Sequence, residues 1–305
     1  MSIIIDAHSH YMPLQVAQKT MFFKVGWSDV DRQLAVMDEY GINKALLLYP
    51  TTDAHLQMGG WQNVCNIYNE EIAEVVSSHP DRFIGAGILP IDEPQNFPRE
   101  LHRIKSLGLK VISLGSSYEG VYLDDPIFFS VYEFATQNAL PIHVHPQIIH
   151  PIGEDRVSDP LLTPVLEYVF DVSVCIGKMM MSGTLQKFPD VKFIFAHYGG
   201  VLPLVKERFD STYQMLRKRN FVKDLGKLPS AYFSNIYVDT SGSRSLNSLL
   251  CALELVDFNH VLFGSDFPAN QTVRESMEAV RQQKSLSVDE KKFILGNNML
   301  NLLSL

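Results

Sequence analysis

Short apolar segments alternate with longer amphipathic segments along the whole chain, and this alternation limits the possible folds more than any other feature. The short segments are almost continuously apolar, which is typical of strands buried on both faces. They cover residues 3–6, 44–49, 83–89, 110–114, 141–145, 191–196, 235–239 and 260–264. Segments with a helical period lie between them, for example at 30–40, 62–78, 97–107, 127–138, 202–219, 246–255 and 273–284. Parallel strands joined by crossover helices are therefore expected.

Eight strand-helix units predict one closed (β/α)8 TIM barrel that spans residues 1–305 as a single domain. The length of 305 residues fits a barrel of about 250 residues with loop insertions. A dinucleotide-binding sheet would carry G-x-G-x-x-G after its first strand, whereas Gly85-Ala86-Gly87 lies inside the third apolar segment. The sequence has neither a P-loop nor a G-x-S-x-G elbow. We expect residues 148–163 and 222–233 to be loop insertions or parts of a lid.

The composition excludes several functional classes. Twenty-six Lys and Arg against 34 Asp and Glu give a net charge of −8, which argues against a nucleic-acid partner. No stretch approaches 18 apolar residues, so we expect no membrane span. The three cysteines, Cys65, Cys175 and Cys251, lie far apart and form no C-x-x-C pair, as is usual in a reducing compartment. A cytoplasmic enzyme is the resulting expectation.

Histidine and aspartate gather where four of the eight strand segments end. The carboxyl ends of the strands carry the active site in a TIM barrel, so these side chains should share one pocket. The concentration is informative because the whole chain has ten histidines. The four segments are Asp6-Ala7-His8-Ser9-His10, His143-Val144-His145-Pro146, Phe195-Ala196-His197-Tyr198-Gly199-Gly200 and Gly264-Ser265-Asp266-Phe267-Pro268.

The spacing of His8 and His10 is suited to metal binding. Residues two apart on a strand share a face, and their Cα atoms lie about 6.6 Å apart, so both imidazoles can reach one ion. His145 and Asp266 complete a plausible ligand set, and catalytic zinc usually has three protein ligands and an open position. An isolated His-x-His is more often a surface pair or a core pair, but its combination with three other strand ends favours a metal site. We expect Asp6 on the same face, where it would orient a ligand.

The same segments resemble the ordered motifs of the amidohydrolase superfamily. More narrowly, they are similar to the amidohydrolase-related branch that contains aminocarboxymuconate semialdehyde decarboxylase. The motifs are Asp-Ala-His-Ser-His, His-Val-His-Pro, Phe-Ala-His-Tyr-Gly-Gly and Phe-Gly-Ser-Asp-Phe-Pro. Similarity continues through linking segments at 37–42, 79–83, 187–192 and 296–298. These linking motifs are shared across the branch, so they identify the family better than the substrate.

The resemblance implies one divalent metal ion, usually zinc and in some members manganese, held by His8, His10, His145 and Asp266. It implies that His197 is the catalytic histidine. It also implies a decarboxylase of a small unsaturated or aromatic carboxylic acid, with a metal-dependent hydrolase or hydratase of a lactone, amide or conjugated oxo-acid as the alternative. Relatives further suggest a homodimer.

Each catalytic candidate also has a structural interpretation. His197 could cap the following helix, and Asp266 could be a helix N-cap. As catalytic groups, Asp266 would accept or relay a proton, and His197 would stabilise negative charge or exchange a proton with the substrate. A carboxylate substrate would need a nearby cation. The resemblance indicates Arg208, which could instead pair within its own helix, and Lys24 is a weaker candidate.

Overall fold

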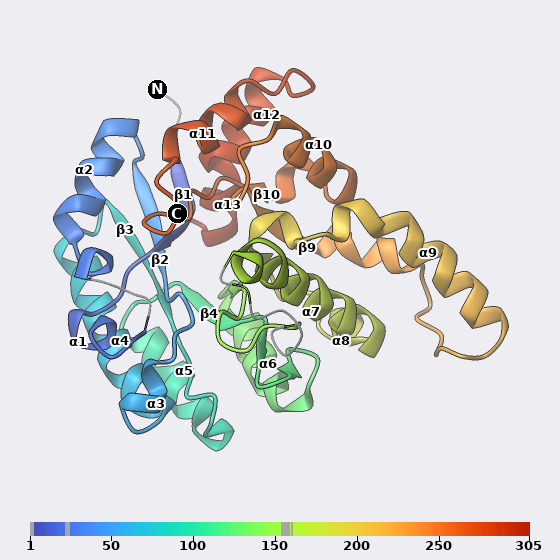
Figure 1. The fold of residues 1–305 in the computed structure, drawn as a ribbon, viewed down its shortest axis with the longest axis horizontal. Coiled ribbons are helices and arrows are strands. Elements are labelled where there is room, and N and C mark those ends of the chain that lie inside the picture. Colours follow the sequence, from blue (N-terminus) through green and yellow to red (C-terminus); the bar gives the residue numbers. More distant parts are fainter. Residues whose placement is uncertain (1–2, 22–24, 154–158, 160) are drawn as a thin grey trace.

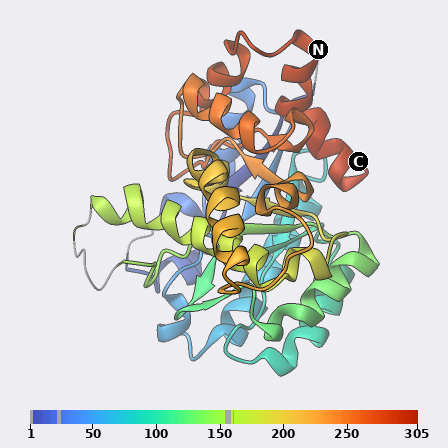
Figure 2. The same cartoon turned by 90° about the vertical axis from the view of Figure 1, so that its right-hand side faces the viewer.

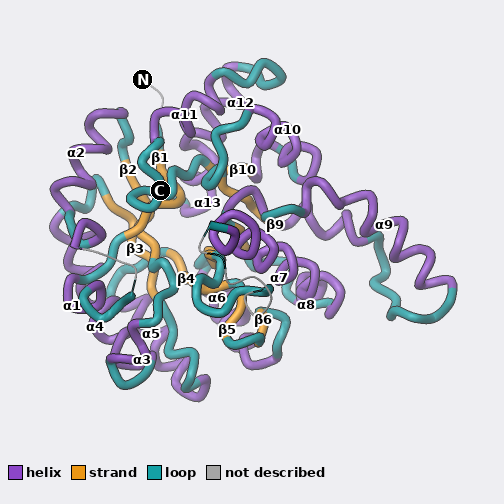
Figure 3. The backbone as a smooth tube through the Cα atoms, viewed as in Figure 1, coloured by secondary structure: helices purple, strands orange, loops and turns teal. Residues whose placement is uncertain are grey.

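Eight parallel strands form the centre of the chain, and helices surround them (Figures 1 and 3). The computed structural model describes residues 3–21, 25–153, 159 and 161–305. The strand order is β1-β2-β3-β4-β7-β8-β9-β10, which confirms the predicted (β/α)8 barrel. The strands are β1 (Ile5–His10), β2 (Lys44–Leu48), β3 (Phe83–Gly87), β4 (Val111–Gly115), β7 (Ile142–His145), β8 (Phe193–Phe195), β9 (Ile236–Asp239) and β10 (Val261–Leu262).

The barrel is closed by hydrogen bonds between β1 and the segment that follows β10. The amide of Ala7 donates to the carbonyl of Phe263 at 2.7 Å, and the amide of His10 donates to the carbonyl of Phe267 at 2.7 Å. In the opposite direction, the amide of Asp266 donates to the carbonyl of His8 at 2.8 Å. Barrel closure therefore uses the backbone of the same residues that the sequence proposes as metal ligands.

The amphipathic segments predicted from the sequence are helices, with ends that differ by a few residues at most. Helix α2, for example, begins after the Asp29 side chain, which accepts from the amide of Arg32, and ends at Gly41 in the left-handed conformation. None of the described helices is both long and apolar enough to cross a membrane. The helices are α1 (Leu14–Ala17), α2 (Val30–Tyr40), α3 (Ala54–Gln57), α4 (Trp61–Ser78), α5 (Phe97–Ser106), α6 (Phe129–Asn138), α7 (Tyr168–Ser182), α8 (Thr184–Lys187), α9 (Leu202–Lys218), α10 (Leu246–Leu255), α11 (Val273–Arg281), α12 (Val288–Lys292) and α13 (Asn298–Leu303).

Several elements lie outside the segments named in the sequence, among them helices α7, α12 and α13. A short hairpin of β5 (Ser117–Tyr118) and β6 (Val121–Tyr122) follows β4. Within the expected insertion at 148–163, residues 154–158 and 160 lie outside the described part of the chain, and a π-helical turn at Thr163–Glu167 leads into α7. The insertion at 222–233 runs into a 3-10 helix at Pro229–Asn235. Helices α7 and α9 lie on the same side of the barrel (Figure 2).

Alternate residues along the strands belong to two hydrophobic cores. In β2, Leu46 and Leu48 pack with Ile5 and Ile84 inside the barrel, while Leu47 packs in the larger core between strands and helices. Both faces of the strands are thus buried, which explains why the strand segments are almost continuously apolar in sequence.

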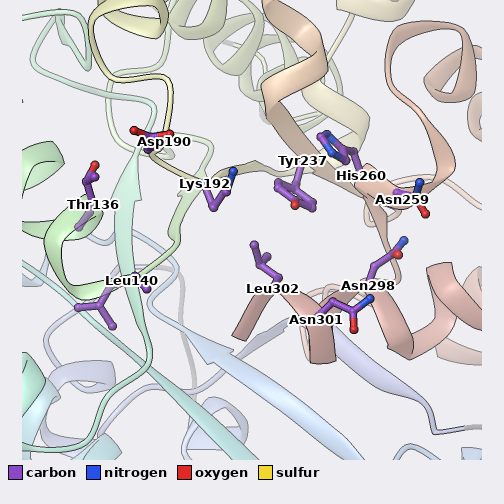
Figure 4. Close-up of a pocket in the computed structure, with 12 residues that line it drawn as sticks. Thr136, Leu140, Asp190, Lys192, Tyr237, Asn259, His260, Asn298, Asn301 and Leu302 are labelled. Carbon is purple, nitrogen blue, oxygen red and sulfur yellow. The ribbon is translucent and has the colours of Figure 1, made fainter. Parts of the chain in front are cut away.

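A cavity of about 360 Å³ lies at the amino-terminal ends of β8, β9 and β10 (Figure 4). His260 precedes β10, and its ring stacks on Tyr237 of β9 with ring centroids 4.4 Å apart. Nδ1 of His260 also bonds to the carbonyl of Ile236 at 3.0 Å. The amino-terminal end of a TIM barrel serves stability rather than catalysis, so the geometry agrees with a structural role for His260.

Gly296 provides a test of how tightly the carboxyl-terminal segment packs on β1. A Cβ atom at Gly296 would lie 2.4 Å from the carbonyl oxygen of Ile3, which is backbone and has little room to move. We expect Gly296→Ala to lower the free energy of unfolding by about 1–3 kcal/mol. Urea denaturation of the purified protein measures this change.

Gly177→Ala in α7 is the matched control, because a Cβ there would meet only the ring of Phe209 at 3.4 Å. Alanine in a helix interior stabilises by about 0.5–1 kcal/mol relative to glycine. Equal stability of the two variants would contradict the close packing of Gly296 on the amino-terminal segment.

Candidate metal centre and active site

Four predicted ligands converge at the carboxyl-terminal end of the barrel. His8 and His10 come from β1, His145 ends β7, and Asp266 follows β10. The Nε2 atoms of His8 and His10 are 3.1 Å apart, and Oδ1 of Asp266 lies 3.3 Å and 3.0 Å from them. Together with a ring nitrogen of His145, the ligand atoms all lie within 4.8 Å of one another. The structure therefore brings these four residues into one group.

A β-bulge in β1 sets the direction of the two histidines. Asp6 pairs with Ala45, whereas Ser9 pairs with Leu47, so β1 contains one additional residue between these positions. The expectation that Asp6 shares a face with His8 and His10 was therefore wrong. The carboxylate of Asp6 instead accepts hydrogen bonds from the amides of His8 and Ser265, both at 3.0 Å, and joins β1 to the closing segment.

The other ring nitrogen of each histidine is held by an acceptor. Nδ1 of His8 bonds to Oδ2 of Asp239 at 2.8 Å, Nδ1 of His10 to the carbonyl of Leu48 at 3.3 Å, and Nδ1 of His145 to the carbonyl of Pro146 at 2.9 Å. These acceptors assign the proton to Nδ1, so each Nε2 presents a lone pair. With one proton on each ring, three lone pairs and a carboxylate face one another, an arrangement that a divalent cation would stabilise in place of a second proton on His8.

The charges of the buried groups favour a cation at the same place. Burial raises the pKa values of Asp239 and Asp266, but contacts with neighbouring histidines outweigh it and hold both values well below the usual range. Burial lowers the pKa of His145, and nearby His10 lowers it further. Burial also opposes charge on His8, but Asp239 and Asp266 raise its pKa to about 10. Two ionised carboxylates thus require compensating positive charge in a buried site.

Asp239 at the end of β9 is the central acceptor of the site, and the sequence analysis missed it. It is fully buried, and its Oδ2 accepts from His8 and, at 3.0 Å, from Nε2 of His143. Its Oδ1 accepts from the amides of His197 at 3.1 Å and Ser241 at 3.0 Å. The strand-end rule that selected Asp266 would also have selected Asp239, because the predicted strand at 235–239 ends on it.

His197 is oriented by Ser241. The Ser241 hydroxyl donates to Asp239, so its oxygen can accept the Nδ1 proton of His197 at 2.8 Å. This pairing leaves the lone pair of His197 Nε2 available to a substrate. The ring stacks on His8 with centroids 5.4 Å apart. Gly242 must be glycine here, because a Cβ would lie 2.7 Å from Nδ1 of His197.

The capping interpretations of His197 and Asp266 do not match the geometry. The N-cap of α9 is Val201, so His197 does not cap that helix. The carboxylate of Asp266 contacts His8 and His10, and the N-cap of the following helix α11 is Thr272. Both His197 and Asp266 have positive φ angles, 54° and 63°, an uncommon backbone conformation that concentrates at functional sites.

A cavity of about 560 Å³ opens above the ligand group. His10, His145, His197 and Asp266 line it, and the first two are no more than 5% exposed. Its walls include the rings of Trp27 and Tyr168 together with the apolar residues Pro164 and Val165, and Arg244 also lines it. The cavity is therefore large enough for one small aromatic or unsaturated acid.

Of the two predicted substrate-binding cations, the structure describes only Arg208, and Arg208 does not line this cavity. Arg208 is exposed on α9, which extends away from the barrel in Figure 1, and it lines a separate groove with Met181 and Val205. The geometry of a single chain therefore does not support the predicted contact of Arg208 with substrate, because helix α9 places Arg208 away from the cavity. Lys24 lies outside the described residues. The homodimer and the cytoplasmic location stay predictions.

Comparisons with known proteins give relatives over most of the chain. The chain is 30% identical over 243 residues to 2-amino-3-carboxymuconate-6-semialdehyde decarboxylase of Dictyostelium discoideum, covering 78% of this chain and 65% of that protein. It is 27% identical over 284 residues to gamma-resorcylate decarboxylase of Polaromonas sp. strain JS666, covering 88% and 85%.

A solved structure of similar fold is a dihydroxybenzoic acid decarboxylase from Polaromonas sp. JS666 with bound manganese and the inhibitor 2-nitroresorcinol. It has a TM-score of 0.82 and 23% identity, and the match covers 100% of this chain and 97% of that one. The family model described as amidohydrolase matches residues 5–305. Sequence motifs, barrel and family match therefore agree that this chain belongs to the amidohydrolase family.

Proposed function

We propose that this protein is a decarboxylase of small unsaturated or aromatic carboxylic acids that uses one divalent metal ion. The observation that carries the proposal is the convergence of acceptor atoms from His8, His10, His145 and Asp266 beneath a cavity that His197 also lines. Both relatives described above are decarboxylases, which supports this reaction over hydrolysis or hydration.

One ion fits the donor set. A second possible group, His8, His197 and Asp239, shares His8 with the first, and the Nδ1 of His8 is already bonded to Asp239. Three imidazoles and one carboxylate suit zinc, which we propose as the ion. Manganese, which the similar solved structure binds, is the alternative. Elemental analysis after purification without chelators distinguishes the two.

The residues of the site have separate tasks in this reaction. When bound, a divalent ion supplies positive charge that orients substrate oxygens and stabilises negative charge. In decarboxylation, the carbon that bears the carboxylate gains a proton. The carbon–carboxylate bond then breaks, its electron pair restores the double bond or ring, and carbon dioxide leaves. His197, with Nδ1 held by Ser241, takes up a proton from solvent at Nε2 and delivers it to this carbon, and Asp266 can relay it.

Product analysis tests the reaction type. We expect carbon dioxide release from 2,6-dihydroxybenzoate or related acids, loss of this activity after chelation, and recovery when a divalent ion is restored. The measurement is headspace carbon dioxide with a parallel assay of acid release from lactones. Hydrolysis of lactones without carbon dioxide release from any acid would support the alternative function instead.

His197→Asn tests the proton-exchange role. We expect turnover to fall by about 10²- to 10⁴-fold, because asparagine has no exchangeable ring proton, while metal content stays unchanged. Steady-state kinetics and elemental analysis measure both quantities. His102→Asn is the control, since His102 is exposed and its ring lies against Phe134 on the outside of the barrel. Full activity of His197→Asn would remove this assignment.

Asp239→Asn tests the support of the ligand group. The carboxylate accepts from His8 and His143 at one oxygen, so replacing it with an amide loses the charge that fixes the His8 ring. We expect metal affinity to fall by about 10- to 100-fold, measured by competition with a chelator. Asp190→Asn is the exposed control at the opposite end of the barrel. Equal affinities in both variants would disprove the supporting role.

A further inference from the structure

Arg244 is the sole lysine or arginine that lines the cavity above the ligand group, within the part of the chain that the structure describes. The other charged residues and histidines of the cavity are His10, His145, His197 and Asp266. The proposed function already assigns these to metal binding and proton exchange. A permanent cation at this place therefore has no task in the reaction as described so far.

The loop that carries Arg244 is anchored on both sides of it. The carbonyl of Ser243 accepts from the Tyr198 hydroxyl at 3.4 Å, and the Oγ atoms of Ser243 and Ser248 are 2.9 Å apart. Ser245 donates its amide to Oγ of Ser243 at 3.2 Å and forms the N-cap of α10. The backbone at Arg244 is thus fixed beside Gly242 and Ser241, which position His197.

The guanidinium of Arg244 has no hydrogen bond or ion pair among the described residues. Several other arginines are paired with acids, as Arg82 is with Asp38 at 2.7 Å and Arg217 with Asp224 at 2.8 Å. Arg244 is exposed whereas the three histidines of the ligand group are buried, so its guanidinium lies on the solvent side of the cavity. A planar donor group without an internal anion is suited to bind a carboxylate from outside the chain.

We propose that Arg244 binds a second carboxylate of the substrate, one that points away from the metal. The substrate is then a dicarboxylic aromatic or unsaturated acid. This inference rests on the proposed function, which places the reacting carboxylate of the substrate at the metal end of the cavity. The reacting carboxylate loses its charge as carbon dioxide forms, so a cation paired with it would stabilise the ground state more than the transition state. A cation paired with the remote carboxylate stabilises the ground state and the transition state equally, because that carboxylate keeps its charge.

Ligand binding tests this assignment without turnover. The probes are benzene-1,3-dicarboxylate and benzoate, and isothermal titration calorimetry on the metal-loaded protein measures both affinities. We expect Arg244→Gln to weaken binding of the dicarboxylate by about tenfold, a value that allows for the exposure of the pair, and to change benzoate binding by less than about twofold. Arg244→Lys should recover part of the loss. Arg219→Gln, at the exposed end of α9, is the charge-matched control.

With a dicarboxylate that is turned over, Arg244→Gln should raise KM and leave kcat unchanged. Equal losses for both probes, no loss for either, or no binding of the dicarboxylate to the wild-type protein would overturn the proposal. Unchanged metal content and circular dichroism exclude a folding defect as the cause. Absence of carbon dioxide release combined with the expected binding difference would contradict the proposed function and retain the role of Arg244 as a carboxylate-binding residue.

Discussion

The buried carboxylate of Asp239 is the interaction on which the rest of the site depends. One of its oxygens accepts from His8 and His143, and the other accepts from the backbone of His197 and Ser241. A charged group in this position is stable only when its hydrogen bonds are complete. The need to complete the hydrogen bonds of Asp239 therefore fixes the positions of β1, β7, β8 and β9 relative to one another. It also fixes the tautomer of His8, a proposed metal ligand.

Closure of the barrel and formation of the site are the same structural event. The hydrogen bonds of Ala7, His10 and Asp266 that join the first strand to the last segment also place His8, His10 and Asp266 around one point. The β-bulge in β1 contributes by turning Asp6 towards Ser265, where its carboxylate holds the closing segment. A change that loosened this closure would thus disturb the ligand group directly, even without replacing a ligand.

The charge distribution explains how an acidic protein can accept an acidic substrate. A net charge of −8 does not attract an anion from a distance, so binding depends on local positive charge. A divalent ion at the cavity floor and Arg244 on the solvent side would provide that charge at two points. Such an arrangement would select the orientation of a dicarboxylate substrate, with the reacting carboxylate beside His197 and the remaining carboxylate outward.

The sequence by itself determined the barrel and four residues of its centre. Apolar strand segments report burial on both faces, and the carboxyl ends of parallel strands must meet, so His8, His10, His145 and Asp266 could be grouped before any coordinates. The tertiary structure decided what depends on strand register and on the direction of loops and helices. The rule that residues two apart on a strand share a face failed for Asp6. A bulge moves a side chain to the other face, and nothing in the order of the residues reveals it. Arg208 was carried outward along α9. Arg244 was brought to the cavity by a loop whose path is fixed by contacts with Ser248 and with Tyr198, which is distant in the sequence and comes close to the loop only when the chain folds.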